Sequence, residues 1–131
     1  MCYKTGNFEK ALKQTFFALD ARMRTKDVQK ELRKIREKMG VEEVWKSRAG
    51  CTASVVLITR DQIYCANAGD SRTVISKNDG KQSEALSYDH KPNDEVELNR
   101  IKSAGEKVRR GRIRGLLAVS RAFGDFKYKD K

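Results

Sequence analysis

The sequence has few of the residues from which self-sufficient active sites are most often built. Among its 131 residues there is one histidine, His90, and there are three cysteines without a C-x-x-C pair. A single histidine excludes a two-histidine metal site, and the lack of a C-x-x-C pair argues against a His/Cys zinc cluster. The odd number and wide spacing of the cysteines argue against a disulfide framework and favour a reducing compartment. We therefore expect a cytoplasmic or nuclear protein.

Long apolar stretches and common active-site signatures are also missing. The sequence has no run of about 18 apolar residues, so it predicts no transmembrane helix and no membrane partner. Its first residues, MCYKTGNFEK, lack the apolar core of a signal peptide. The G-x-S-x-G elbow, the G-x-x-x-x-G-K-[ST] phosphate loop and the dinucleotide fingerprint do not occur. These absences argue against a serine hydrolase of that type and against a nucleotide-binding domain.

Negative charge is scarce relative to positive charge. The 29 Lys and Arg residues outnumber the 18 Asp and Glu residues, which gives a net charge of +11. Nucleic acid, an anionic surface or a phosphorylated substrate would each suit such an excess. The excess is spread along the chain, apart from one dense cluster that contains Lys107, Arg109, Arg110, Arg112 and Arg114. No aromatic residue in this cluster is available to stack on bases, so we interpret it mainly as a solvated face.

The first third of the chain has a helical pattern. Apolar residues recur at steps of three and four over residues 8–23 and again over residues 27–40, which predicts two helices. Asn7 is the predicted N-cap of the first helix, and Gly40 is the predicted C-terminal cap of the second. Alternating charges on the second helix indicate an exposed outer face. Coiled-coil pairing is the competing interpretation, although the segment has fewer than three heptads.

The middle of the chain is rich in β-branched residues broken by short polar turns. Three strands are predicted, over residues 53–59, 63–68 and 73–77, with turns at Arg60-Asp61 and Asn78-Asp79-Gly80. We expect an antiparallel meander inside a larger sheet. Because residues 55–58 are all apolar, the first strand is predicted to be covered on both faces.

The last third returns to a helical pattern and then becomes irregular. Pro92 is expected in the first turn of a helix. The apolar face of this helix is formed by Val96, Leu98, Ile101 and Ala104, and Gly105 ends it. The remaining residues predict a loop-rich excursion that returns to a strand or a short helix.

Asp70 is the best-placed carboxylate in the sequence. It lies in the segment CANAGDSRTVI, directly after Gly69 at the end of a predicted strand, where a side chain can point into a cleft. Aspartate is also common in turns because its side chain bonds nearby backbone groups. On spacing alone, the interpretation as a simple turn is the favoured one.

Four longer motifs favour a functional role for Asp70 over a simple turn. SRAGCTASVVLI, IYCANAGDSRTVIS, LSYDHKPNDEVELNRIKSAGEKV and GLLAVSRAFGD follow one another with compact spacing. Together they resemble the metal-dependent type 2C family of protein serine/threonine phosphatases, over about residues 8–130. The resemblance implies an α+β fold, an antiparallel β-sandwich flanked by helices in α/β/β/α layers, here incomplete. One partial catalytic domain over residues 1–131 is expected, with a helical part (8–40), a β meander (50–88) and a flap-like region (89–126).

The resemblance also implies a chemistry, which is hydrolysis of phosphoserine and phosphothreonine proteins by a water activated by Mg²⁺ or Mn²⁺. Asp70 matches the aspartate of the family's Gly-Asp-Ser-Arg motif and is the one metal position carried over. Thr52 and His90 fall in family motifs, and we interpret them either as residues that support the metal ligands without touching the metal or as structural residues. Arg121 and Asp125 are expected to form a structural ion pair. No catalytic residue is assigned, and the substrate-binding residues stay unknown.

Several family motifs do not occur in this sequence. The Asp-Gly-His-Gly, Asp-Gly and Asp-Asn segments that carry the main metal ligands are absent, and Asp79-Gly80 lies in a turn at the wrong place. Arg114 stands where the family usually has Asn, within the basic run of the flap. We therefore expect a fragment of a phosphatase that is inactive alone. The alternatives are a non-catalytic interaction or regulatory module and, less favoured, a basic nucleic-acid-binding protein.

Overall fold

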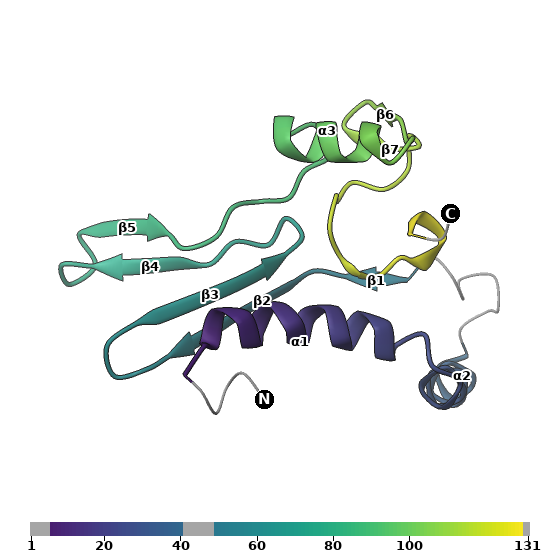
Figure 1. Ribbon diagram of the computed structural model, residues 1–131, viewed down its shortest axis with the longest axis horizontal. Helices are drawn as coiled ribbons and strands as arrows, with labels where there is room; N and C mark the ends of the chain where they lie inside the picture. Colours follow the sequence, from purple (N-terminus) through teal and green to yellow (C-terminus); the bar gives the residue numbers. More distant parts are fainter. Residues whose placement is uncertain (1–5, 41–48, 130–131) are drawn as a thin grey trace. The chain divides into compact units, whose positions relative to one another are not determined.

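The computed structural model describes residues 6–40 and 49–129. It is a mixed α and β structure with antiparallel strands, which confirms the predicted class (Figure 1). The helices are α1 (Phe8–Arg22), α2 (Lys26–Met39), α3 (Glu95–Ser103) and the short 3₁₀ helix η3 (Phe126–Tyr128). The strands are β1 (Gly50–Cys51), β2 (Ala53–Ile58), β3 (Ile63–Ala68), β4 (Val74–Lys77), β5 (Gln82–Ala85), β6 (Val108–Arg109), β7 (Arg112–Ile113) and β8 (Phe123–Gly124). None of the helices in the described part is long and apolar enough to cross a membrane.

The chain divides into two compact units. The first contains residues 1–51 and 123–131, and the second contains residues 52–122. Each unit is described by itself below. Whether the whole chain behaves as one domain stays a prediction.

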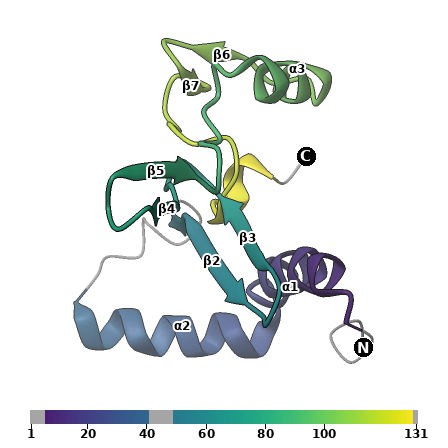
Figure 2. The same cartoon turned by 90° about the vertical axis from the view of Figure 1, so that its left-hand side faces the viewer.

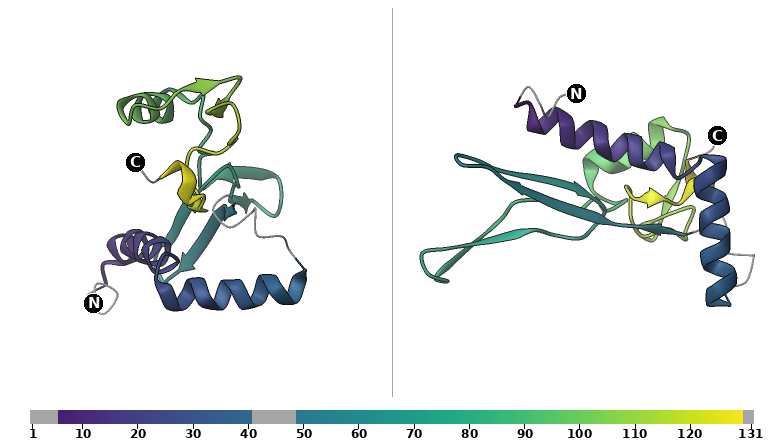
Figure 3. Two further views of the ribbon diagram at one scale, coloured as in Figure 1. Left: turned by 90° about the vertical axis from the view of Figure 1, so that its right-hand side faces the viewer. Right: turned by 90° about the horizontal axis from the view of Figure 1, so that it is seen from below.

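In the first unit, both predicted helices are confirmed. The side chain of Asn7 accepts a hydrogen bond from the Lys10 N–H (3.1 Å), as expected of an N-cap. Gly40 ends α2 in the left-handed conformation (φ 65°), which a glycine adopts without steric cost. Figures 2 and 3 show that α2 runs across the direction of α1.

The end of the chain packs on α1 within this unit. β8 pairs with β1 in antiparallel register, with Cys51 opposite Phe123. The ring of Phe123 is buried and lies 5.1 Å from that of Phe16, measured between centroids. Asp20 accepts hydrogen bonds from the Gly124 N–H (2.9 Å) and from Lys129 Nζ (2.8 Å). An aromatic contact and a carboxylate on α1 therefore hold a segment about a hundred residues away.

The second unit contains two longer hairpins. β2 pairs with β3 from Ala53 opposite Ala68 to Ile58 opposite Ile63. β4 pairs with β5, with Val74 opposite Ala85. The three predicted strands are confirmed to within one residue at each end. β5, which has the sequence QSEA, was not predicted because it lacks the β-branched residues that identified the others.

Two expectations about the sheet are wrong. The strands do not form one meander, because β4 pairs with β5 and each sheet of the described part has two strands. In the link between β3 and β4, the carbonyl oxygen of Gly69 accepts a hydrogen bond from the His90 N–H (2.9 Å). Nor is β2 covered on both faces, since Val55, Val56 and Ile58 are 41%, 43% and 72% exposed. Within the described part of this unit, β2 has only β3 as a sheet partner.

The helix α3 differs from the prediction at its start and in its buried face. Asp94 is its N-cap and accepts a hydrogen bond from the Val96 N–H (3.2 Å), so Pro92 precedes the helix in a turn and is buried there. The face that points inward carries Ile101 and Glu97, whereas Val96 is 71% exposed. An ion-paired glutamate therefore takes the place that the apolar pattern assigned to valine.

Candidate functional site

The turn after β3 is built around Gly69. Its φ of 112° is one that side-chain-bearing residues rarely adopt. A Cβ at this position would lie 2.3 Å from Cγ2 of Thr52, the residue directly before β2. Conformation and close packing both require glycine, so the direction in which the chain leaves β3 is fixed by this residue.

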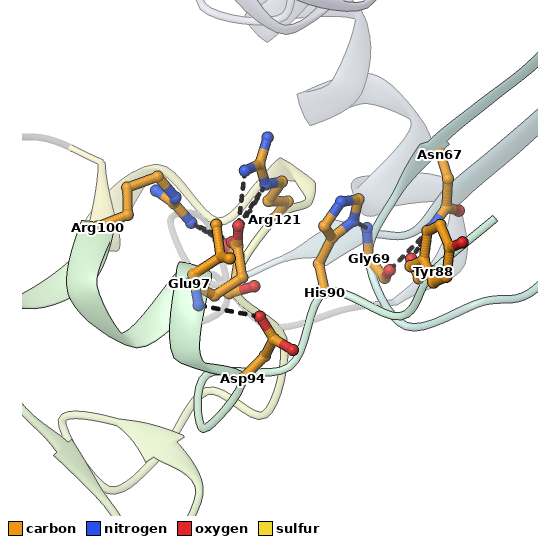
Figure 4. A network of polar contacts seen from close by, with 10 residues as sticks. Asn67, Gly69, Tyr88, His90, Asp94, Glu97, Arg100 and Arg121 are labelled. Atoms are coloured by element: carbon orange, nitrogen blue, oxygen red, sulfur yellow. Dashed lines mark hydrogen bonds and ion pairs between the residues drawn. The ribbon is translucent and has the colours of Figure 1, made fainter.

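His90 holds Gly69 from both sides. The Gly69 N–H donates to Nδ1 of His90 (3.2 Å), and the His90 N–H donates to the Gly69 carbonyl oxygen (2.9 Å). The Nδ2 of Asn67 donates to the same carbonyl and to that of Tyr88, both at 3.0 Å (Figure 4). Since Nδ1 accepts, the neutral ring carries its proton on Nε2. Burial, followed by the nearby Arg121 guanidinium, lowers the pKa of His90 and favours this neutral form.

Asp70 is exposed and follows this clamped glycine directly. The next residue, Ser71, shares a hydrogen bond of 2.6 Å with the Thr52 hydroxyl, so the backbone is held on both sides of Asp70. Arg72 binds another carboxylate, since its Nε donates to Asp89 Oδ1 (2.9 Å). This hydrogen bond is the main reason that the pKa of Asp89 is lowered. Within the described part of the chain, the Asp70 carboxylate has no side-chain partner.

A second polar cluster lies on α3 and the segment that follows β7. Glu97 is 3% exposed, and its carboxylate accepts hydrogen bonds from Arg121 Nη2 (2.6 Å) and Arg100 Nη2 (2.7 Å) (Figure 4). Burial alone would raise the pKa of Glu97, but the two guanidinium groups overcome it and lower the pKa to about 2. Sequence reasoning missed this cluster, although the Glu97/Arg100 spacing of one helical turn is a signal for an ion pair.

The two clusters are joined through Ser120. Arg100 Nη2 also donates to the Ser120 carbonyl oxygen (2.7 Å), and the Ser120 N–H donates to the His90 carbonyl oxygen (3.0 Å). A continuous path of hydrogen bonds thus leads from Glu97 to Gly69. Of the two roles considered for His90 from the sequence, its contacts with Gly69 and Ser120 support the structural one.

Arg121 and Asp125 do not have the predicted arrangement. The carboxylate that Arg121 binds is that of Glu97. Asp125 is buried in the first unit, in the left-handed conformation (φ 50°), and burial raises its pKa. A Cβ on Gly50 would lie 2.1 Å from its Oδ2, so the carboxyl group packs directly against that glycine.

The described residues do not by themselves fit a resident metal ion. They include no group of three or more His, Cys, Asp or Glu side chains placed to hold one. Mg²⁺ and similar hard cations take several oxygen ligands, and Asp70 offers one carboxylate. Asp70 is thus at most one member of a ligand set, and no reaction step can be derived through a metal ion from these residues.

Comparison with known proteins identifies the family. The family model for protein phosphatase 2C matches residues 3–131. "Probable protein phosphatase 2C 5" of Paramecium tetraurelia is 48% identical over 127 residues, which cover 97% of this chain and 41% of the relative. "Protein phosphatase 2C homolog 2" of Schizosaccharomyces pombe is 46% identical over 126 residues, or 95% of this chain and 29% of the relative.

A third relative, "Protein phosphatase ppm-1.G" of Caenorhabditis elegans, is 52% identical over 90 residues, or 69% of this chain. The chain spans about two fifths of the length of the first Paramecium relative. Because the family model covers nearly the whole sequence, the chain belongs to the protein phosphatase 2C family.

Proposed function

We propose that this chain is part of a metal-dependent protein serine/threonine phosphatase that acts on phosphoserine and phosphothreonine proteins with Mg²⁺ or Mn²⁺. The observation that carries the proposal is the family match over residues 3–131 together with the Gly69–Asp70 turn. The turn presents an exposed carboxylate from a backbone that is fixed on both sides. Its cytoplasmic or nuclear location, expected from the cysteines, is part of the same proposal.

The role proposed for Asp70 is to supply one oxygen ligand. Bound metal ions in phosphatases activate a water and offset the charge of the phosphoryl group. The contacts of Gly69 and Ser71 already hold the backbone on both sides of Asp70, so little backbone entropy is lost when its carboxylate binds a cation. Since one carboxylate does not hold Mg²⁺, the isolated chain is expected to be inactive.

Grafting tests this proposal. Residues 3–131 would replace the matched segment of the Paramecium relative, and release of phosphate from a phosphothreonine peptide would be measured with Mn²⁺. The hybrid is expected to turn over, and Asp70→Asn is expected to lower kcat/KM at least about tenfold, the low end for groups near a metal centre. Asp61→Asn, an exposed aspartate in the β2–β3 turn, is the matched control and should have no effect. A folded hybrid without turnover, or equal effects of the two substitutions, would refute the proposal.

A non-catalytic interaction module is the second candidate. The lack of a metal-ligand cluster within the described part favours it. The graft separates the two candidates, since only a phosphatase segment restores turnover to the hybrid, and the same peptide assay on the 131-residue chain, with Mn²⁺ and with chelator, adds a second test. Chelator-sensitive turnover by the chain alone would exclude this second candidate and would show that our expectation of inactivity is wrong.

A further inference from the structure

The β2–β3 hairpin has one strand edge that pairs with no other strand in the described part of the chain. At its turn the Thr59 N–H donates to the Gln62 carbonyl oxygen (2.9 Å). In an antiparallel ladder the hydrogen-bonded pairs recur at every second residue, so the odd-numbered residues of β2 are the ones bonded to β3. The N–H and C=O groups of the even-numbered residues point to the free edge, and these residues are Ser54, Val56 and Ile58.

This edge lacks the features that usually prevent one strand from pairing with another chain. Charged residues and prolines commonly protect a free edge, but neither strand of this hairpin contains one. The side chains of Val56 and Ile58 are 43% and 72% exposed, and Ile63, opposite Ile58 on β3, is 45% exposed. The β4–β5 hairpin differs, because it carries the ion pair of Lys77 and Glu84. The edge of β2 therefore combines free backbone groups with exposed apolar side chains.

The neighbouring hairpin contacts β2 only near its start. The hydroxyl groups of Thr52 and Ser54 bond to those of Ser71 and Thr73, which precede β4. These bonds engage side chains and leave the backbone groups at the edge of β2 unoccupied. Beyond them, the β4–β5 hairpin diverges from the β2–β3 hairpin toward their turns, as the right-hand view of Figure 3 shows. The later part of β2 is therefore open to a further strand.

The charge of the chain restricts where two copies can touch. Each copy has a net charge of +11, and like net charge opposes self-association. Contact between copies is therefore favoured on a surface without charge. Since β2 and β3 contain no charged residue, a copy that approaches along the edge of β2 brings no charge of either strand against the other copy.

We propose that the chain forms a two-fold dimer in which β2 pairs antiparallel with β2 of a second copy. A two-fold axis perpendicular to the sheet places residues of the same face opposite each other. With Val56 opposite Val56 of the second copy, Ser54 lies opposite Ile58, and every free N–H and C=O group of these three residues has a partner. A register shifted by two residues would pair one of the three with a residue outside β2. The product is a four-stranded sheet, with two β2 strands in the centre and β3 at each edge.

The dimer is expected to be weak. A seam of two strands of six residues is small compared with a standard protein interface, so association should depend on concentration. The proposal does not rest on the phosphatase function, because it uses only the strand edge and the charge of the chain.

Sedimentation velocity of the 131-residue chain over a range of concentrations tests the association, with reductant present because Cys51 is exposed. A reversible equilibrium between monomer and dimer is expected. Val56→Lys places two like charges directly opposite each other and removes an apolar cross-strand pair, so it should raise the dimer Kd about tenfold or more. Ile63→Lys is the matched control, since it adds the same charge at a similarly exposed position on β3, away from the seam. It should change the Kd less than about threefold, because its two copies are separated by more than a Debye length. Circular dichroism checks that both variants fold.

Disulfide cross-linking without reductant tests the register. In the proposed dimer the Cα atoms of Val56 and its counterpart are about 5.5 Å apart, within the usual reach of a disulfide. Val56→Cys should therefore give more covalent dimer than the wild-type chain, whose own cysteines set the background. The two Val55 residues lie diagonally, about 7–8 Å apart, which is beyond that reach. Val55→Cys should give no covalent dimer above the background.

The outcomes separate this dimer from the other ways in which the edge could be used. A chain that stays monomeric at all concentrations would overturn the proposal and leave the edge to a strand of a different protein. Growth into larger species without a dimer would overturn it in favour of unspecific aggregation. Equal effects of Val56→Lys and Ile63→Lys would show that the copies meet elsewhere. Equal cross-linking of Val55→Cys and Val56→Cys would refute the register centred on Val56.

Discussion

The two charged turns of the second unit are built in opposite ways. The Gly69–Asp70 turn is negative, and both of its flanks are held by hydrogen bonds to residues about twenty positions away. The β6–β7 turn is positive, open at its tip, and opposes Arg109 to Arg112. In the first turn the surrounding structure fixes the backbone that carries one charge. In the second, the backbone holds several positive charges close together without ion-pair partners among the described residues. An anionic ligand would reduce the repulsion between them.

The largest expected difference between the two turns is in the stability that is lost when their glycines are replaced. Gly69→Ala should destabilise the chain by about 3 kcal/mol, because a strained backbone is combined with a 2.3 Å clash against Thr52. Gly111→Ala should cost about 1 kcal/mol, since only the left-handed conformation opposes it. Denaturant unfolding of both variants measures the difference. Equal losses of stability would show that the first turn tolerates a Cβ as well as the second does.

Glu97 supports the first turn through Arg100, Ser120 and His90. Its substitution should therefore cause the second largest loss of stability. Glu97→Gln should cost about 2 kcal/mol at neutral pH, below the usual range for a broken buried pair because Arg100 and Arg121 are about half exposed. Glu95→Gln, at an exposed position of the same helix, is the control. Urea unfolding gives the stability, and amide hydrogen exchange at Gly69 shows whether the effect reaches the turn. Unchanged exchange there would mean that the path of hydrogen bonds carries no coupling.

The same variant makes a prediction about pH. The folded pKa of Glu97, about 2, lies below its ordinary value of 4.5. Its contribution to stability is therefore complete above pH 4.5 and is lost as the pH falls toward 2. The stability difference between the wild-type chain and Glu97→Gln should shrink over this interval. A difference that stays constant down to pH 2 would contradict the assignment of the ion pair.

His90 tests the clamp itself. His90→Leu leaves the buried Gly69 N–H without an acceptor and should cost about 1–2 kcal/mol more than His90→Asn. The Asn Oδ1 lies the same number of bonds from the backbone as Nδ1 and can replace it as an acceptor. Unfolding free energies of the pair give the comparison, and both variants lose the ring. If His90→Asn is no more stable than His90→Leu, the hydrogen bond to Nδ1 does not stabilise the turn.

The smallest expected change in stability comes from a substitution in the β6–β7 hairpin. Arg109→Gln should stabilise the chain by about 0.3 kcal/mol at low salt, because it removes one of two opposed like charges. The gain should fade as salt is added and screens the pair. Thermal unfolding at two ionic strengths measures it, with Arg60→Gln as the control. A loss of stability would mean that Arg109 has a favourable partner.

Local features of the fold were predictable from the sequence, and features that depend on neighbours were not. The apolar spacing gave both N-terminal helices, and Asn7 and Gly40 marked two of their ends, because caps act within one turn. The prediction that β2 is covered on both faces was wrong. A run of apolar residues indicates that a strand is stable when covered, but it does not show which residues cover it. The burial of Glu97 was not predicted for a similar reason, since its arginine partner at position 121 lies 24 residues away.

The candidate site follows the same division. Asp70 could be found because the motif around it is contiguous, and its role as a metal ligand stays a prediction. The clamp on Gly69 could not be found, since His90 is 21 positions away and a histidine in a polar segment has many possible roles. The basic cluster was visible as composition, whereas the opposition of Arg109 to Arg112 needed the strand register.

The sequence separation of these contacts has a consequence for the order of folding. The β6–β7 hairpin closes over two residues, and hairpins of this kind form within microseconds. The bonds that fix Asp70 join residues 19 and 21 positions apart, and the partner of Glu97 is 24 positions away. Loop closure of that length precedes any gain from the contact. The arginine-rich turn can thus be complete while Asp70 still samples many directions, so the acidic turn is the later of the two to reach its final form.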